Sequence, residues 1–310
     1  MSKKPNRLKQ APNSSKSFRW WHVAAVTVLI AALFFILEKL KTNYQKEVVV
    51  PTPSLKSPAN VVGEDYSQKS YSTVRKIPAR NSKRHPPRHL SGTLAIIVDD
   101  MGSSLNEARE LLSINIPITF AIIPGLAKVK SVADAADSAG REVMVHLPME
   151  SQEYPKRRLE ANGLLVSYSE DEITARTIEL LNAVPHAKGA NSHMGSRFTE
   201  QEEKMLPVLK VLQGRGLFFI DSLTTPRSRG SAVAESLGVK TAARNVFLDN
   251  QQDVAAIKKQ LYSAAELSRR KGGVIAICHP HSATIAALKE SMPELQRAGI
   301  TFVSAGELVR

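Results

Sequence analysis

Aspartate and histidine side chains follow five short apolar runs in the last two thirds of the chain. The sequence places Asp99 and Asp100 after LAIIV, His146 after VMV, His193 just past AKGAN, Asp221 after LFFI, and His279 after VIAIC. Carboxylate and imidazole ligands without thiolates suit Zn²⁺, Mn²⁺, Fe²⁺ or Co²⁺, with zinc foremost among these ions. Such an ion acidifies its bound water and polarises a carbonyl group. These residue types therefore predict metal-dependent hydrolysis.

The two neighbouring aspartates suggest a division of labour. Consecutive strand residues face opposite ways, so one carboxylate is free to bind metal while the other orients water. A histidine on the far side of the site can protonate the leaving group. The plainer readings are that Asp99 and Asp100 cap the next helix and that His146 is a core histidine.

The elements that must position these residues begin near Thr93. Short apolar runs alternate there with longer stretches whose apolar residues recur at helical spacing. The predicted strands cover residues 94–98, 118–123, 143–147, 187–191, 217–220, 239–248, 274–278 and 300–303, of which 187–191 and 239–248 are weak. Capping-box spacing predicts helix starts at Ser104–Glu107, Ser169–Glu172 and Thr199–Glu202.

Nearly continuous apolar strands that alternate with helices predict a parallel sheet covered by helices. Seven or eight such units over residues 93–310 favour a (β/α) barrel, with a doubly wound open sheet as the alternative. In either fold the carboxyl ends of the strands meet at one face. The strand-end acids and imidazoles are therefore expected to share one site.

The charge distribution argues against nucleic-acid binding. The chain carries a formal net charge of +13, but residues 93–310 hold 25 basic and 25 acidic side chains. The predicted folded domain therefore lacks the electrostatic footprint that phosphate backbones require. The lone cysteine, Cys278, permits neither an intramolecular disulfide nor a cysteine-based metal cluster.

The N-terminal third predicts a tethered protein. Residues 1–19 are predicted to form a basic cytoplasmic tail, and residues 20–38 contain an apolar stretch long enough for a single transmembrane anchor. The positive-inside rule places the bulk of the chain on the periplasmic side of the inner membrane. A cleaved signal peptide is the rival interpretation, but no small-residue cleavage site follows closely. Residues 39–92, rich in Pro, Ser, Lys and Arg, predict a disordered linker.

The strand-end motifs resemble those of the divergent polysaccharide deacetylases over about residues 93–310. The resemblance is carried by five motifs: IVDDMG at Asp99–Asp100, VHLPME at His146–Glu150, NSHMGSRFT at Asn191–Arg197, FIDS at Asp221, and HPH at His279–His281. It implies a distorted (β/α) barrel related to carbohydrate esterases that remove N- or O-acetyl groups from polysaccharides.

The resemblance also implies roles for individual residues. Asp99 matches the general base, Asp100 a metal-binding aspartate, and His279 the histidine that acts as acid. The wider superfamily has a second histidine four residues after the first, whereas this chain has Glu150 after His146. Either Glu150 replaces that ligand or His193 supplies it, and we favour the ligand set Asp100, His146 and His193.

Four more residues are candidates for the site. Asp221 is assigned to the catalytic group, and the other three are weaker candidates. Asp221 is expected to line the site and orient a histidine. Glu150, Arg197 and His281 are further candidates, with Arg197 expected to hold Asp99 or a substrate oxygen, or to form a plain salt bridge.

The sequence thus predicts a membrane-anchored, metal-dependent hydrolase that deacetylates an envelope polysaccharide. The alternative is a catalytically inactive barrel that binds envelope glycan or a cell-wall partner protein, motivated by the change from histidine to Glu150. A metal phosphoesterase is less favoured because no glycine-rich phosphate cradle is evident.

Overall fold

The structure is a computed structural model that describes residues 91–310. The predicted cytoplasmic tail and membrane anchor, and nearly all of the predicted linker, lie outside the described residues. No helix within residues 91–310 is both long enough and apolar enough to cross a membrane.

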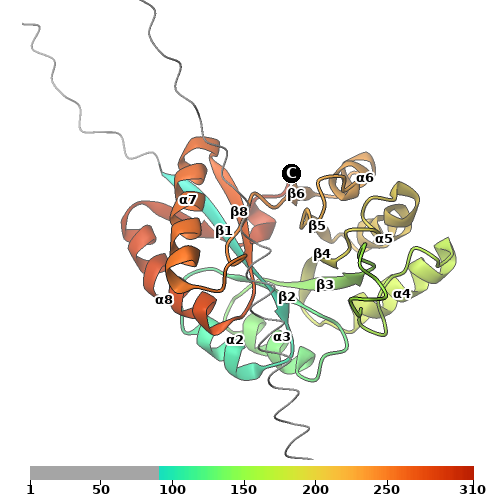
Figure 1. The fold of residues 1–310 in the computed structure, drawn as a ribbon, viewed down its shortest axis with the longest axis horizontal. Helices are drawn as coiled ribbons and strands as arrows, with labels where there is room; N and C mark the ends of the chain where they lie inside the picture. Colours follow the sequence, from blue (N-terminus) through green and yellow to red (C-terminus); the bar gives the residue numbers. More distant parts are fainter. Residues whose placement is uncertain (1–90) are drawn as a thin grey trace, which may run out of the picture. The chain divides into compact units, whose positions relative to one another are not determined.

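Nine parallel strands form one sheet in the order β6-β5-β4-β3-β2-β1-β8-β7, with β9 paired to β1 (Figure 1). Their bounds are β1 Gly92–Met101, β2 Thr119–Ile122, β3 Val143–Met149, β4 Ala187–Met194, β5 Phe218–Asp221, β6 Thr241–Ala243, β7 Val246–Phe247, β8 Gly273–Cys278 and β9 Ile300–Val303. The predicted parallel α/β architecture is confirmed, and every predicted apolar run forms strand structure.

Helices connect the strands and cover the outer face of the sheet, as parallel strands require crossover connections. They are α2 Leu105–Leu112, α3 Val129–Ser138, α4 Glu170–Asn182, α5 Glu202–Gly214, α6 Gly230–Ser236, α7 Val254–Lys271 and α8 Ser282–Arg297, followed by the short 3₁₀ helix η1 Ala305–Glu307. In Figure 1, α7 and α8 lie at the left of the view near β1 and β8, and α4, α5 and α6 lie at the right near β3, β4 and β5.

The segment between β5 and α7 gives the sheet its barrel-like form. The predicted strand at 239–248 is divided into β6, which pairs with β5, and β7, which pairs with β8. Between them, Arg244 donates its backbone N–H to Asp221 O, and Asn245 donates to Ile275 O. One segment, residues 241–247, therefore supplies the strands at both ends of the strand order.

Alternation along the strands separates an outer core from an inner one. In β1, Leu94, Ile96 and Val98 belong to the large cluster packed against the helices. Ala95 and Ile97 belong to a smaller cluster with Met144, Ile220 and Ile277 from other strands. Because successive side chains of a strand point to opposite faces, this smaller cluster fills the inside of the barrel.

Helix starts were predicted well in two cases out of three. Ser104 caps α2 by accepting the Glu107 N–H, and Ser169 forms a complete capping box with Glu172 at α4. The capping box predicted at Thr199 is wrong, because α5 begins at Glu202 with Gln201 as its cap. The Thr199 hydroxyl instead donates to Gly195 O, at 2.9 Å.

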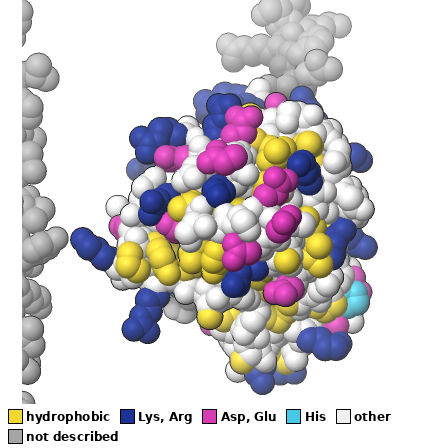
Figure 2. All heavy atoms as spheres, turned by 90° about the vertical axis from the view of Figure 1, so that its right-hand side faces the viewer, with side chains coloured by type: hydrophobic (Ala, Val, Ile, Leu, Met, Phe, Trp, Pro, Cys, Tyr) yellow, Lys and Arg dark blue, Asp and Glu magenta, His cyan; other side chains and the backbone are white. Residues whose placement is uncertain are grey.

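The face of the domain drawn in Figure 2 agrees with the balanced charge of this part of the chain. Figure 2 shows lysine and arginine side chains interspersed with aspartates and glutamates on the face that lies to the right in Figure 1. A surface of mixed sign gives no continuous track for a phosphate backbone.

Candidate functional site

The candidate site is the layer of inward-facing side chains directly above the inner core. Because alternate strand residues share a face, the residue two positions after an inner-core residue also points inward. This relation links Ile97 to Asp99, Met144 to His146, Ile220 to Ser222, Ala242 to Arg244, and Ile277 to His279. These polar residues line a cavity of about 540 Å³ at the carboxyl ends of the strands.

Asp100 reaches the same cavity through a local distortion of β1. The β1–β2 register shifts between Val98 and Met101, which marks a bulge. Asp100 itself has a φ of 56°, in the left-handed region. Bulges near active sites re-aim side chains, and this one brings two consecutive aspartates to one cavity. Asp99 and Asp100 therefore do not face opposite ways, as regular strand alternation predicts, but reach the same cavity.

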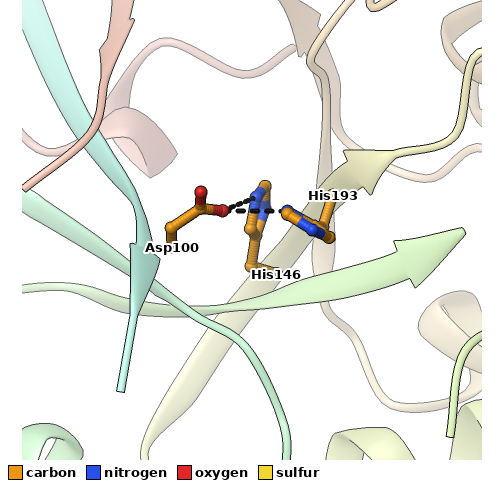
Figure 3. Close-up of side chains that lie close together, drawn as sticks. All are labelled: Asp100, His146 and His193. Atoms are coloured by element: carbon orange, nitrogen blue, oxygen red, sulfur yellow. Dashed lines mark ion pairs between the residues drawn. The ribbon is translucent and has the colours of Figure 1, made fainter. Parts of the chain in front are cut away.

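Asp100, His146 and His193 form a compact cluster of donor atoms (Figure 3). Asp100 Oδ1 lies 3.2 Å from His146 Nε2 and 2.8 Å from His193 Nδ1. Neither contact has hydrogen-bond geometry, so Asp100 Oδ1 is buried without a donor. Ligands bound at about 2.1 Å to one tetrahedral ion lie roughly 3.4 Å apart. The cluster therefore fits a divalent transition metal.

Asn191 fixes the orientation of this cluster from beneath. Its Nδ2 donates to Asp99 Oδ1 at 2.8 Å, and its Oδ1 lies 2.7 Å from His146 Nδ1. Since the amide oxygen only accepts, His146 must donate from Nδ1. Neutral His146 then presents the lone pair of Nε2 toward Asp100, which is the tautomer that a metal ligand needs.

His193 has a carboxylate on the far side of its ring. Glu160 Oε2 lies 3.7 Å from His193 Nε2 and is buried without a hydrogen-bond donor. Metal-bound histidines commonly direct their second ring nitrogen toward a carboxylate. Glu160 is therefore placed to orient the His193 ring.

Strong electrostatic coupling marks the cluster. Burial alone would raise the pKa of Asp100, but the adjacent imidazoles outweigh it and hold that pKa far below its ordinary value. Burial opposes protonation of His146, yet Asp99 and Asp100 raise its pKa to about 9. Burial raises the pKa of Asp99, against His146 and Asn191. A bound cation would displace the proton only from the ligating nitrogen of each imidazole, because metals bind neutral histidine.

His279 is held by a carboxylate that the sequence did not single out. Its backbone N–H donates to Asp249 Oδ2 at 2.7 Å, and its Nδ1 lies 3.2 Å from Asp249 Oδ1. Burial opposes protonation of His279, but Asp249 and Asp100 raise its pKa. Its Nε2 faces the site, 3.8 Å from Asp100 Oδ2. An imidazole held in this way is equipped to donate a proton.

Glu150 and Arg197 lie close to each other rather than in the metal cluster. Glu150 is buried, with Oε1 2.9 Å from Arg197 Nη1 and Oε2 accepting from Val166 N. Of the two ways to complete the ligand set, the geometry therefore brings His193, not Glu150, to Asp100 and His146. Arg197 forms the plain salt bridge and does not contact Asp99.

Asp221 and His281 also lie away from the cluster. Asp221 faces outward and accepts hydrogen bonds from Leu223 N, Ser228 Oγ and Ser231 N, at 2.8–3.1 Å. The expectation that it orients a histidine is not met, because Asp249 has that place. His281 is exposed, with its Nε2 3.0 Å from Gln252 Nε2.

The site also contains residues that were not predicted, among them Asn191, Asp249, Arg244 and Glu160. Asp249 directly follows the weak run 239–248. The pattern of acids and histidines after apolar runs would therefore have indicated Asp249 if that run had been a clear strand. Asn191 lies inside β4, and its importance depends on contacts with two other strands. Arg244 shares its inward face with Ala242, a pattern that a three-residue strand scarcely reveals.

The fold and the cavity together define a parallel, barrel-like α/β domain with an Asp-His-His cluster at the carboxyl ends of its strands. The family model described as divergent polysaccharide deacetylase matches residues 96–309, so the chain belongs to that family. The family membership predicted from the five motifs is therefore confirmed.

The chain is also similar to two bacterial proteins and to one protein of known structure. The chain is 37% identical to the uncharacterized protein YibQ of Escherichia coli over 71% of this chain and 68% of that one. It is 34% identical to an uncharacterized protein of Haemophilus influenzae, over 70% and 76% of the two chains. The crystal structure of ATU2773 from Agrobacterium tumefaciens shares the fold, with a TM-score of 0.68, 22% identity, and coverage of 71% and 89%.

Proposed function

We propose that this chain is a membrane-anchored, metal-dependent hydrolase that removes acetyl groups from an envelope polysaccharide. The observation that carries the proposal is the cluster of Asp100, His146 and His193, in which a buried carboxylate oxygen lies between two imidazole nitrogens without a hydrogen-bond donor. Family membership supports the substrate class. The anchor at residues 20–38 and the periplasmic location rest on the sequence pattern alone.

The chain's own residues divide the chemistry of acetyl removal. Asp100, His146 and His193 would hold the ion, with zinc foremost, and a bound divalent cation supplies Lewis acidity at this position. Asp99, held at Oδ1 by Asn191, takes a proton from the attacking water. His279, held by Asp249, returns a proton to the leaving amine or alcohol.

A non-catalytic glycan-binding barrel is the competing function. Its motive was the replacement of a second ligand histidine by Glu150. His193 supplies a third donor atom beside Asp100 and His146, and Asp99 and His279 line the same cavity. The geometry therefore favours the enzyme.

Metal content and acetate release, measured together on the full-length chain, test the proposal. We expect zinc to bind in a ratio of one per chain, and acetate to be released from acetylated amino-sugar oligosaccharides. Asp100→Ala should lose both metal and turnover. Asp99→Asn should keep the metal but lose rate by about 10²–10⁴-fold. Asp171→Ala, on the exposed first turn of α4, is the matched control and should resemble wild type.

Two results would contradict the proposal. If Asp100→Ala retained its zinc, the ligand assignment would be wrong. If the metal-loaded wild type bound glycan but released no acetate, the non-catalytic alternative would replace the enzyme.

A further inference from the structure

Arg244 is a cation in the wall of the cavity that no carboxylate of residues 91–310 neutralises. It lies on the inward face between β6 and β7 and lines the same cavity as Asp99, His146 and His279. No acidic group of the described domain forms an ion pair with it, although Asp99 and Asp221 are near enough to influence its charge. A half-buried guanidinium without a carboxylate to balance its charge calls for an explanation.

The structure fixes this guanidinium rigidly. Nε donates to Ser222 O at 2.6 Å and Nη2 donates to Leu223 O at 2.8 Å, so one edge of the fork is held by the loop after β5. The Cζ atom lies 5.3 Å from the centre of the Phe247 ring. Side-chain entropy is therefore already lost before any ligand arrives, which favours tight binding.

The remaining edge of the fork is free within the described domain. An arginine has five N–H donors, and the two carbonyl oxygens use one from Nε and one from Nη2. Three N–H groups remain, and two of them, one on each terminal nitrogen, point the same way. Two parallel donors of this kind match the two oxygens of a carboxylate or a phosphate.

A second observation comes from the residue beside it. Ser222 lines the cavity and is 5% exposed, and its hydroxyl has no hydrogen-bond partner. Buried hydroxyls normally find a partner. Ser222 and Arg244 together present donors without acceptors on one wall of the cavity, which is the arrangement that an anion would satisfy.

We propose that Arg244 selects glycans that carry an anionic substituent, a carboxylate or a phosphate ester, on or beside the acetylated sugar. This inference rests on the proposed function, because it names the substrate class of the same cavity. Asp99 and Asp100 do not oppose it, since the divalent ion at the proposed site would offset their charge.

Binding to matched ligand pairs tests the inference. The full-length, zinc-loaded chain is titrated calorimetrically with N-acetylmuramic acid and its methyl ester, and with N-acetylglucosamine 6-phosphate and N-acetylglucosamine. We expect the anionic member of at least one pair to bind at least about tenfold more tightly, as a charge-assisted fork predicts. A preference within the muramic acid pair identifies the bound anion as a carboxylate, and a preference within the glucosamine pair identifies it as a phosphate ester.

Variants locate the effect. Arg244→Gln should reduce the discrimination to within about twofold, and Arg244→Lys should retain part of it, because charge remains but the fork is lost. Arg227→Gln, an exposed arginine paired with Glu200 outside the cavity, is the matched control and should keep the full discrimination. Thermal melting of each variant checks that the loop after β5 still folds.

The result that overturns the inference is equal affinity for both members of both pairs in the wild type, or no binding of any of them. Discrimination that survives in Arg244→Gln overturns it as well. Binding requires no turnover, so these outcomes are separate from the acetate assay: a chain that prefers anions but releases no acetate contradicts the proposed function alone.

Discussion

At the scale of single residues, the site depends on side chains that hold other side chains. Asn191 joins Asp99 to His146, and Asp249 joins His279 to α8 through its contact with the Thr284 hydroxyl, at 2.9 Å. Each of these partners fixes which nitrogen of an imidazole carries a proton. Because hydrogen bonds of this kind set ligand basicity and ring orientation, their loss should change metal binding and pH dependence rather than the fold alone.

Removal of the Asn191 amide should weaken metal binding. In Asn191→Ala, no amide holds the proton of His146 on Nδ1 and none donates to Asp99 Oδ1. The zinc dissociation constant is therefore expected to rise by about 10–100-fold. Competition with a chromophoric chelator measures it. Asn162→Ala removes an amide that donates to Pro124 O away from the cluster and should leave zinc affinity unchanged. An unaltered affinity in Asn191→Ala would show that the bridge does not position His146.

Neutralisation of Asp249 should shift the pH dependence of the reaction. Burial opposes the charge of His279 and Asp249 sustains it, so Asp249→Asn lowers the pKa of His279. A general acid must be protonated, and the alkaline limb of the kcat/KM profile is therefore expected to move to lower pH. Asp253→Asn makes the same chemical change at the exposed cap of α7 and should leave the limb in place.

The contact between Asp249 and His279 also predicts how the free energy of unfolding varies with pH. The raised pKa of His279 gives stability that is complete below its ordinary value of about 6.5 and is lost as pH rises through the folded-state pKa. The lowered pKa of Asp249 gives stability that is complete above about 3.9 and is lost at lower pH. The difference in unfolding free energy between wild type and Asp249→Asn should therefore be largest from about pH 4 to 6.5.

At the scale of the elements, strand parity decides which residues reach the cavity. Ser222 and Arg244 continue the inner faces of β5 and β6, whereas Asp221 continues an outer face. The bulge in β1 is the exception that brings both aspartates inward. Asp221 thus organises the loop before α6 instead of joining the reacting groups.

Replacement of Asp221 should cost stability without loss of the metal. Asp221→Ala removes an acceptor for three loop donors, and hydrogen bonds to a buried charge suggest a loss of about 3 kcal/mol. Chemical denaturation measures the loss, while zinc stoichiometry should stay at one per chain. A variant of normal stability that fails in acetate release would instead restore the catalytic role predicted for Asp221.

The sequence predicted the strands and several of the site residues because both leave local signals. Apolar runs followed by Asp or His located β1, β3 and β8 together with Asp99, His146 and His279. The contacts of Asn191 and Asp249 could not be read in this way, since they join residues 30 to 92 positions apart. The left-handed backbone of Asp100 has no local signal either, because it follows from pairing with β2.

At the scale of the whole molecule, the two ends of the barrel have different tasks. The carboxyl ends of the strands hold the cavity. At the other end, Glu142 accepts from the Thr119 hydroxyl and from Gly306 N, which attaches the C-terminal 3₁₀ helix to β2 and β3. Parallel barrels generally separate reactivity from stability in this manner.

A change at the stabilising end should therefore leave the site intact. Glu142→Ala removes the acceptor of both donors and is expected to lower the unfolding free energy by about 2 kcal/mol. Glu290→Ala, which breaks an exposed ion pair with Lys258, should cost less than about 1 kcal/mol. Zinc affinity should be unchanged in both variants. Weaker zinc binding in Glu142→Ala would show that the two ends are coupled.

The central claim is that Asp100, His146 and His193 form one metal site, and an anomalous difference map at the zinc edge tests it most directly. Crystals of the chain grown with zinc should show a strong peak about 2.0–2.2 Å from Asp100 Oδ1, His146 Nε2 and His193 Nδ1. The absence of a peak between these atoms would contradict the account. So would a peak held only by Asp249, His279 and His281, the other cluster of suitable donors among residues 91–310.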